Sequence, residues 1–186
     1  MSAGRPLFVI LAFFLFMKVS HATVVMKVDP EALTANADVV FIGKVLEIKT
    51  FSDKNDEKKI STSVIFDVKE VYKGSLKKGL FRLTFLGGKK GEWELKVIGM
   101  PVFQVGEEVL LFLEKNSDGY IPSALSLGKF RIVKDENGKY KAVRSYEGIE
   151  PFTGQGILPQ NQPLEEFDLD RLVDIIKATV KPGVMK

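Results

Sequence analysis

Two glutamates, Glu92 and Glu94, are the side chains in this sequence whose spacing best suits acid–base chemistry. Residues two apart on a strand point to the same face, which places their carboxylates roughly 7 Å apart. That separation falls within the range of the two carboxylates of an inverting glycosidase. Together with Lys96, however, the same residues fit the solvated face of an amphipathic strand. Because no neighbouring residue indicates an unusual environment for either carboxylate, the solvated face is the favoured interpretation.

Several other catalytic classes lack the residues that they need. The chain contains no cysteine, and its one histidine, His21, lies in an N-terminal segment that we expect to be removed. Thiol nucleophiles, disulfides, thiolate metal sites and histidine-based catalysis are therefore excluded for the remaining chain. We expect a protein that is not an enzyme, with no catalytic residues, no metal site and no cofactor.

Basic and glycine-rich motifs also have simpler interpretations than ligand binding. Residues 87–91, Gly-Gly-Lys-Lys-Gly, resemble a phosphate-binding loop only superficially, because a P-loop needs a wider glycine spacing and a following helix. A hairpin turn is favoured there. The pairs Lys58-Lys59, Lys77-Lys78 and Lys89-Lys90 could line an OB-fold groove for single-stranded nucleic acid. Acidic residues stand beside most of these pairs, so we expect solvated loops and no nucleic-acid partner.

An apolar stretch at residues 100–103, Met-Pro-Val-Phe, lies in a connecting segment between two glycines. It could plug one end of a β-barrel, which is the favoured reading, or form an exposed apolar patch for a partner. Trp93 alternates in phase with Leu95 and Val97, which predicts a core position rather than an exposed platform. The candidate binding residues are Met100, Val102 and Phe103 of this stretch, together with Gly87 and Gly88 of the glycine-rich turn.

The first 22 residues have the three parts of a secretory signal. Arg5 supplies positive charge, residues 7–17 form an uncharged apolar core, and Ser20-His21-Ala22 has small residues where a signal peptidase reads. Eleven helical residues span about 16 Å, against roughly 30 Å of hydrocarbon, so no stable membrane span is expected. An uncleaved anchor is the alternative. We expect cleavage near Ala22 and a periplasmic or secreted protein, whose net charge falls from +3 to +1 on losing Arg5 and Lys18.

The rest of the chain has the pattern of a mainly β protein. Residues 109–113 form an unbroken apolar run bounded by turn signals, which predicts a central strand buried on both faces. Short spacing between strands, with helices only at the two ends, favours a small closed or partly open β-barrel. Seven segments have strand patterns: residues 39–49, 61–73, 80–86, 92–98, 107–114, 128–133 and 139–143.

Helices are expected at both ends of the barrel. Asp29 and Pro30 begin a short N-terminal helix, and Asp168 can cap a C-terminal helix over residues 169–180. That helix has an apolar stripe on one side and should pack on the barrel. We therefore divide the chain into a signal peptide (1–22), an OB-like β-barrel domain (23–144), and an extended segment with the C-terminal helix (145–186).

Three motifs support a family resemblance. Residues 37–45 (ADVVFIGKV), 66–74 (FDVKEVYKG) and 106–113 (GEEVLLFL) resemble the netrin-like, tissue-inhibitor-of-metalloproteinase type of OB-fold. They are also similar to small exported bacterial proteins, largely uncharacterised, with this TIMP-like fold, and residues 99–103 and 128–130 strengthen that similarity. The resemblance implies an OB-fold and, as a partner, another exported protein such as a metallopeptidase.

One departure from that family limits what can be transferred. The metalloproteinase inhibitors begin with a cysteine whose amine and carbonyl chelate the catalytic zinc, and disulfides hold that terminus in place. Here the expected start is Thr23, without any cysteine, so the inhibitory residues cannot be assigned.

The leading functional hypothesis is an exported, non-enzymatic module that binds another protein, such as a secreted peptidase that it accompanies or inhibits. A carbohydrate or small-ligand binding β-barrel is the alternative, since barrel mouths often hold ligands. A carboxylate-based hydrolase that uses Glu92 is the third. The sequence leaves the oligomeric state open.

Overall fold

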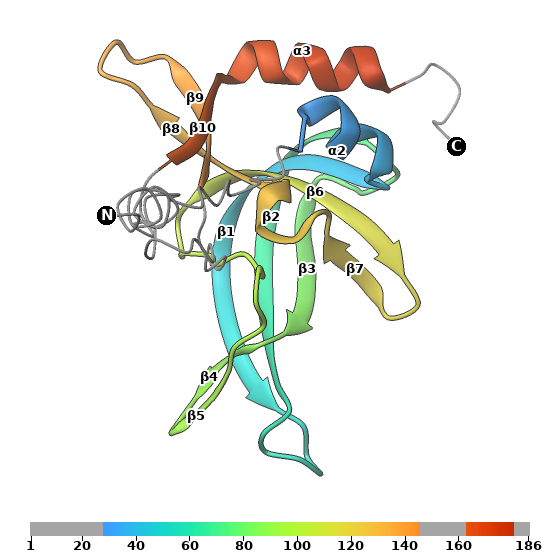
Figure 1. Cartoon of the computed structure of the whole chain (residues 1–186), viewed down its shortest axis with the longest axis vertical. Coiled ribbons are helices and arrows are strands. Elements are labelled where there is room, and N and C mark those ends of the chain that lie inside the picture. The colour runs from blue at the N-terminus through green and yellow to red at the C-terminus, as the bar shows by residue number, and fades with distance from the viewer. Residues whose placement is uncertain (1–27, 146–162, 181–186) are drawn as a thin grey trace, which may run out of the picture.

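The computed structural model describes residues 28–145 and 163–180, which are organised around one large antiparallel sheet (Figure 1). Its elements are α2 (Pro30–Asn36), β1 (Val39–Ser52), β2 (Ile60–Lys73), β3 (Gly79–Leu86), β4 (Gly88–Lys90), β5 (Trp93–Leu95), β6 (Glu108–Asn116), β7 (Gly119–Pro122), η1 (Leu125–Gly128), β8 (Lys129–Lys134), β9 (Tyr140–Ser145), β10 (Pro163–Asp168) and α3 (Leu169–Thr179).

The large sheet has the strand order β10-β9-β8-β6-β1-β2-β3, with β7 paired to β6, while β4 and β5 form a separate hairpin. Strand β1 pairs with β6 only over Val39–Lys44 but with β2 from Val40 to Ser52. The β1–β2 register shifts beside Gly43, where a Cβ would lie 3.0 Å from the Phe41 ring. The irregularity that the glycine predicted within this strand is therefore present.

Strand β6 is buried on both faces, as the sequence predicted. One face, with Leu110 and Phe112, joins a core shared with the two helices, and the other, with Val109, Leu111 and Leu113, joins a core inside the curled β1–β2–β3 part. Alternate side chains of β1 divide between the two cores in the same way. One continuous apolar run therefore supplies two separate hydrophobic layers.

Helices α2 and α3 lie together on the outer side of the first core (Figure 1). Leu172, Val173 and Ile176 of α3 are buried against Leu33 of α2 and the sheet. The Asp168 side chain accepts a hydrogen bond from the Arg171 backbone N–H at 3.5 Å, as expected for a helix cap. Asp29 occupies the N-cap position of α2, but its side chain makes no capping hydrogen bond.

A fully buried arginine, Arg144 on β9, ties the two ends of the described chain together. Its guanidinium donates to the Val28 carbonyl at 2.9 Å and to the Leu127 carbonyl at 3.2 Å, and pairs with the Glu165 carboxylate on β10. The group also lies 5.0 Å from the Phe130 ring centroid. Arg144 thereby fixes the entry to α2 and the strand that leads into α3.

The predicted mainly β fold with a helix near each end is confirmed, and six of the seven predicted strands correspond to β1, β2, β3, β6, β8 and β9. The strand expected over residues 92–98 is wrong in extent, since only Trp93–Leu95 is extended in a ladder. Strands β7 and β10 were not predicted, and β4 lies within the expected glycine turn. The predicted signal peptide and most of the segment after β9 lie outside the described residues.

We expect Arg144→Met to lower the free energy of unfolding by about 3–5 kcal/mol, because it leaves a carboxylate and two carbonyls without their buried donor. Urea denaturation of the wild type and the variant measures this change. Arg131→Met on the exposed face of β8 is the matched control, with an expected change within about 0.5 kcal/mol. Equal effects of the two substitutions would contradict the role given to Arg144.

Ionisation of the Tyr72 phenol on β2 should lower the free energy of unfolding at alkaline pH. Burial raises the pKa of Tyr72 above its ordinary value of 10.0, and the charges of Glu70 and Asp170 raise it further, although Lys177 lies 5.9 Å from the ring. The Tyr72 phenol therefore ionises at a lower pH in the unfolded chain than in the folded one. Its contribution to the free energy of unfolding is present below pH 10 and is lost as pH rises through the folded pKa. We expect unfolding free energies from pH 9 to 11 to fall less steeply for Tyr72→Phe than for wild type or Tyr140→Phe.

Candidate functional site

An apolar pocket of about 300 Å³ lies in the part of the chain that the structure describes. One wall is formed by the ends of β1, β2 and β3, and the other by the β4–β5 hairpin and the segment that follows it. We call residues 96–107, which link β5 to β6, the strap. The residues around the pocket are Ile48, Thr50, Thr62, Val64, Phe85, Leu86, Gly87, Gly88, Lys89, Glu94, Leu95, Lys96, Val97, Met100, Pro101, Val102 and Phe103.

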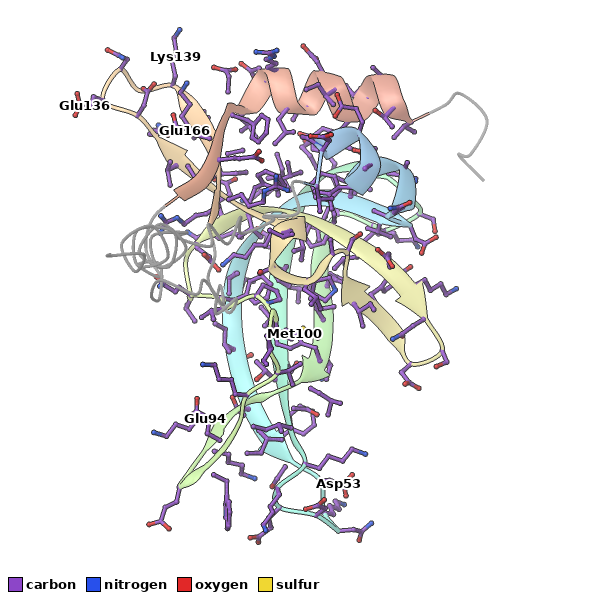
Figure 2. All side chains as sticks on the ribbon, in the orientation of Figure 1. Asp53, Glu94, Met100, Glu136, Lys139 and Glu166 are labelled. Carbon is purple, nitrogen blue, oxygen red and sulfur yellow. The ribbon has the colours of Figure 1, made fainter. Side chains whose placement is uncertain are left out.

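All five candidate binding residues line this one pocket, although they come from two separate stretches of the sequence. Figure 2 labels Met100 of the strap in front of the β1–β2–β3 strands and Glu94 lower, on the β4–β5 hairpin. The strap alternates in exposure: Phe103 is 8% exposed and belongs to the inner core, whereas Val102 is 52% exposed. Residues 100–103 were expected either to plug the interior or to be exposed. They do both, since Phe103 fills the interior and Val102 faces outward.

Gly87 and Gly88 contribute backbone to the pocket and could not be replaced freely. Both have positive φ, +110° and +126°, a region that favours glycine. A Cβ on Gly88 would lie 2.4 Å from the Thr62 hydroxyl oxygen and 2.9 Å from a methyl of Thr50. The Thr62 hydroxyl in turn donates to the Gly87 carbonyl at 2.6 Å. These glycines let the β4–β5 hairpin cross close over β1 and β2 and form the floor of the pocket.

The pocket chemistry suits an uncharged group. Its walls are aliphatic and aromatic, and its three charged lining residues, Lys89, Glu94 and Lys96, are exposed at the rim. The Thr62 hydroxyl is already engaged with Gly87. An ion would lose its hydration on entering such walls without gaining partners there, whereas an apolar group would gain contact.

A buried ion pair fixes the strap, and the sequence analysis missed it. The Lys129 ammonium on β8 lies 2.9 Å from the Glu107 carboxylate and 4.7 Å from the Phe103 ring centroid, and donates to the Val102 carbonyl. The two charged side chains are only 7% and 8% exposed. The same carboxylate accepts the Gln104 backbone N–H at 2.9 Å. Lys129 alternates in phase with the exposed Arg131 in β8, so the local pattern gave no signal that this lysine is buried.

Backbone hydrogen bonds complete the attachment of the strap to the rest of the fold. The Gly99 carbonyl accepts the N–H of Ser126 in η1 at 2.7 Å. At the other end, Gly106 N–H donates to the Val45 carbonyl at 2.8 Å, and Val45 N–H donates to the Glu107 carbonyl at 2.9 Å. The strap is thus held at both ends, and Val102 is presented between them.

The glutamates with the spacing of a glycosidase pair do not share a strand. Glu92 lies in the turn before β5, and Glu94 lies opposite Lys89 in the β4–β5 ladder. Both side chains are exposed, as the solvated interpretation predicted, but the single amphipathic strand that it assumed is wrong. Within the described ranges, no three His, Cys, Asp or Glu residues are placed to hold a metal ion, and no helix there is long and apolar enough to cross a membrane.

The prediction that Trp93 lies in the core is wrong. Its side chain is half exposed, and the Lys58 ammonium lies 5.1 Å from its ring centroid. The phase with Leu95 and Val97 assumed a strand of the main sheet, but β5 is a short strand of a separate hairpin with little core beneath it. Lys90 on the same hairpin donates to the Ser52 hydroxyl at 2.9 Å. Trp93 therefore helps to join the β4–β5 hairpin to the loop between β1 and β2.

Comparisons of this chain with protein-family models, with curated proteins and with solved structures find no match.

We expect Lys129→Met to loosen the strap, because it leaves the Glu107 carboxylate buried without its cation. Amide hydrogen exchange at residues 99–106 should speed up, and the free energy of unfolding should fall by about 3 kcal/mol. Adding Glu107→Gln should recover part of that loss, since the uncompensated charge is removed. The exposed Lys134→Met serves as control, and additive effects of the Lys129 and Glu107 substitutions would contradict the pairing.

Proposed function

We propose that this chain is an exported, non-enzymatic binding module whose pocket receives an apolar side chain of another exported protein. The observation that carries the proposal is the apolar pocket beneath the strap, which all five candidate binding residues line. A tethered, close-packed strap presents three of these residues, Met100, Val102 and Phe103, in a fixed arrangement. That preorganisation favours binding, because little ordering remains to be done when the partner arrives.

The surroundings of the pocket support a protein partner. Val102 and Leu86 lie at the pocket and are about half exposed, and Ile98 and Val105 of the strap are more exposed still. Exposed apolar residues gathered around a hollow are typical of protein interaction sites, where a side chain of the partner enters the pocket and the rim excludes water.

We also propose an OB-like, partly open barrel as the fold, with a secreted metallopeptidase as the partner class that the family resemblance implies. The curl of the sheet supports this, because β7 returns towards β3 and the Tyr120 and Phe81 rings meet at 5.9 Å in the interior. Because the sequence has no cysteine, any inhibition by this chain would differ from that of the metalloproteinase inhibitors, in which the amine of a disulfide-held N-terminal cysteine chelates the zinc.

A small apolar ligand is the second candidate, and the pocket volume favours it. About 300 Å³ is at the lower end of the range of small-molecule sites. It is about twice the roughly 150 Å³ of an engineered apolar cavity that holds benzene. An uncharged molecule of about two fused rings would fill it.

We expect Val102→Asp to abolish capture of the partner without unfolding the chain, because this exposed side chain would bring a charge to the apolar rim. Tagged wild type and variant would be incubated with the exported protein fraction and with purified secreted metallopeptidases, and bound proteins and peptidase inhibition would be measured. Leu46→Asp, at a 43% exposed apolar position outside the pocket, is the control and should retain binding. If neither exported proteins nor peptidases form a complex that depends on Val102, the protein-binding proposal is wrong.

The small-ligand candidate has its own test. Titration with naphthalene would be followed by calorimetry and by Trp93 fluorescence, since Trp93 neighbours the pocket residue Glu94. Saturable binding that Met100→Asp removes would support a ligand site, and absence of saturable heat or quenching would contradict it.

A further inference from the structure

The second half of β1 has a partner strand on one edge and none on the other. Beyond Lys44, β6 no longer pairs with β1, and Val45 bonds instead to Gly106 and Glu107 at the end of the strap. Over residues 47–52, β2 pairs with one edge of β1, and no backbone hydrogen bond joins the other edge to the described residues. Unpaired backbone groups along an edge are a template for another strand.

The hydrogen bond just after β1 shows which of its residues face the open edge. The Asp53 N–H donates to the Lys59 carbonyl at 3.0 Å, so the backbone of Asp53 faces the β2 side. Successive residues of a strand point their N–H and C=O groups to opposite edges. Ser52, Thr50 and Ile48 therefore direct their N–H and C=O groups away from β2, towards the open edge.

The residues that face the open edge also lie at the pocket. The side chains of Ile48 and Thr50 line it, and the Ser52 hydroxyl accepts a hydrogen bond from the Lys90 ammonium of the β4–β5 hairpin at 2.9 Å. In a sheet, the side chain of a residue and that of the residue opposite it lie on the same face. A strand added beside β1 would therefore turn alternate side chains towards the pocket.

Two other edges among the described residues also lack a ladder partner, namely β7 and the outer side of β3. These two strands lie against each other, with the Tyr120 ring packed on the Phe81 ring at 5.9 Å, and no residue of β7 lines the pocket. The open edge of β1 differs from both, because two of the residues that face it are pocket residues and no described strand lies against it.

The β4–β5 hairpin limits what can reach this edge. It crosses β1 and extends beyond it (Figure 1), and a Cβ on Gly88 of the hairpin would lie 2.9 Å from a methyl of Thr50. A second folded sheet brought edge to edge with β1 would meet the projecting hairpin, whereas a single extended segment can lie between the hairpin and the edge. On the outer face of β1, Glu47 and Lys49 pair with each other, so neither charge repels such a segment.

We propose that the partner binds as an extended segment, which adds a strand to β1 along residues 48–52 and inserts one apolar side chain into the pocket. This inference rests on the proposed function, since it concerns the same pocket and the same partner. Main-chain hydrogen bonds supply affinity in such strand addition, and the pocket selects the inserted side chain. The segment has apolar and polar residues in alternation, because one face meets the hairpin and the strap and the other meets water.

Amide hydrogen exchange resolved by residue tests whether the edge is open in the purified full-length expression product. We expect the amides of Ile48, Thr50 and Ser52 to exchange at least about tenfold faster than those of Lys49 and Phe51, whose N–H groups face β2. Equal protection of the two sets in the free protein would show that the edge is already covered, and would overturn the proposal.

Titration with a defined peptide tests strand addition itself. The probe is acetyl-Glu-Val-Thr-Phe-Thr-Val-Glu-amide, which alternates apolar and polar residues. We expect saturable binding that slows exchange of the Ile48, Thr50 and Ser52 amides, and replacement of the peptide phenylalanine by aspartate should raise the Kd about tenfold or more. No saturation at millimolar peptide, or binding that leaves these amides unprotected, would overturn the proposal.

Two variants at Ser52 separate the backbone from the side chain. Ser52→Pro removes an N–H that faces the open edge and should raise the peptide Kd about tenfold. Ser52→Ala removes only the hydroxyl that binds Lys90 and should change the Kd by no more than about twofold. Circular dichroism spectra of both variants should match wild type, because β2 does not use this N–H. Equal peptide affinities of the two variants would contradict pairing at this edge.

The inference and the proposed function fail in different ways. A complex with an exported protein that depends on Val102 but leaves the Ile48, Thr50 and Ser52 amides in fast exchange would overturn strand addition and retain the binding module. Peptide binding that protects these amides, without any Val102-dependent protein complex, would support the strand site and overturn its assignment to an exported protein.

Discussion

Strand β6 has large apolar side chains on both faces, and each face needs its own cover. The helices and β8–β9 cover one face, and the curled β1–β2–β3 part covers the other. Burial of such side chains stabilises a fold by about 1.5–3 kcal/mol each, so neither core is dispensable. The separation of the molecule into a helix-covered side and a pocket-bearing side follows from this double burial.

Two buried cations hold the segments that the cores alone would leave unfixed. Arg144 binds backbone at the entry to α2 and the carboxylate of β10, and Lys129 binds backbone and carboxylate of the strap. Each lies over a phenylalanine ring, Phe130 and Phe103 respectively. An unpaired charge in either position would be costly. Each segment is therefore held in the arrangement that pairs its buried cation. The shape of the pocket therefore depends on a lysine that does not line it.

The pocket reaches the end of β3 at Leu86, which lines it and is 48% exposed. The pocket results from the way the chain leaves β3, through two glycines with positive φ that turn the β4–β5 hairpin over β1 and β2. An apolar hollow bordered by exposed apolar side chains is the feature on which the proposed binding role rests.

Local sequence patterns were enough to predict six of the strands and both helices, because alternation, apolar runs, glycine turns and caps act over neighbouring residues. Residues 109–113 specified a doubly buried strand, and Asp168 specified the start of α3. Tertiary structure alone decided that Gly87, Gly88, Met100, Val102 and Phe103 meet at one pocket, that Glu107 pairs with Lys129, and that Trp93 faces outward. These outcomes depend on how the strap and the β4–β5 hairpin cross the sheet. Contacts between residues distant in the chain fix that crossing, and a periodic pattern over neighbouring residues does not predict such contacts.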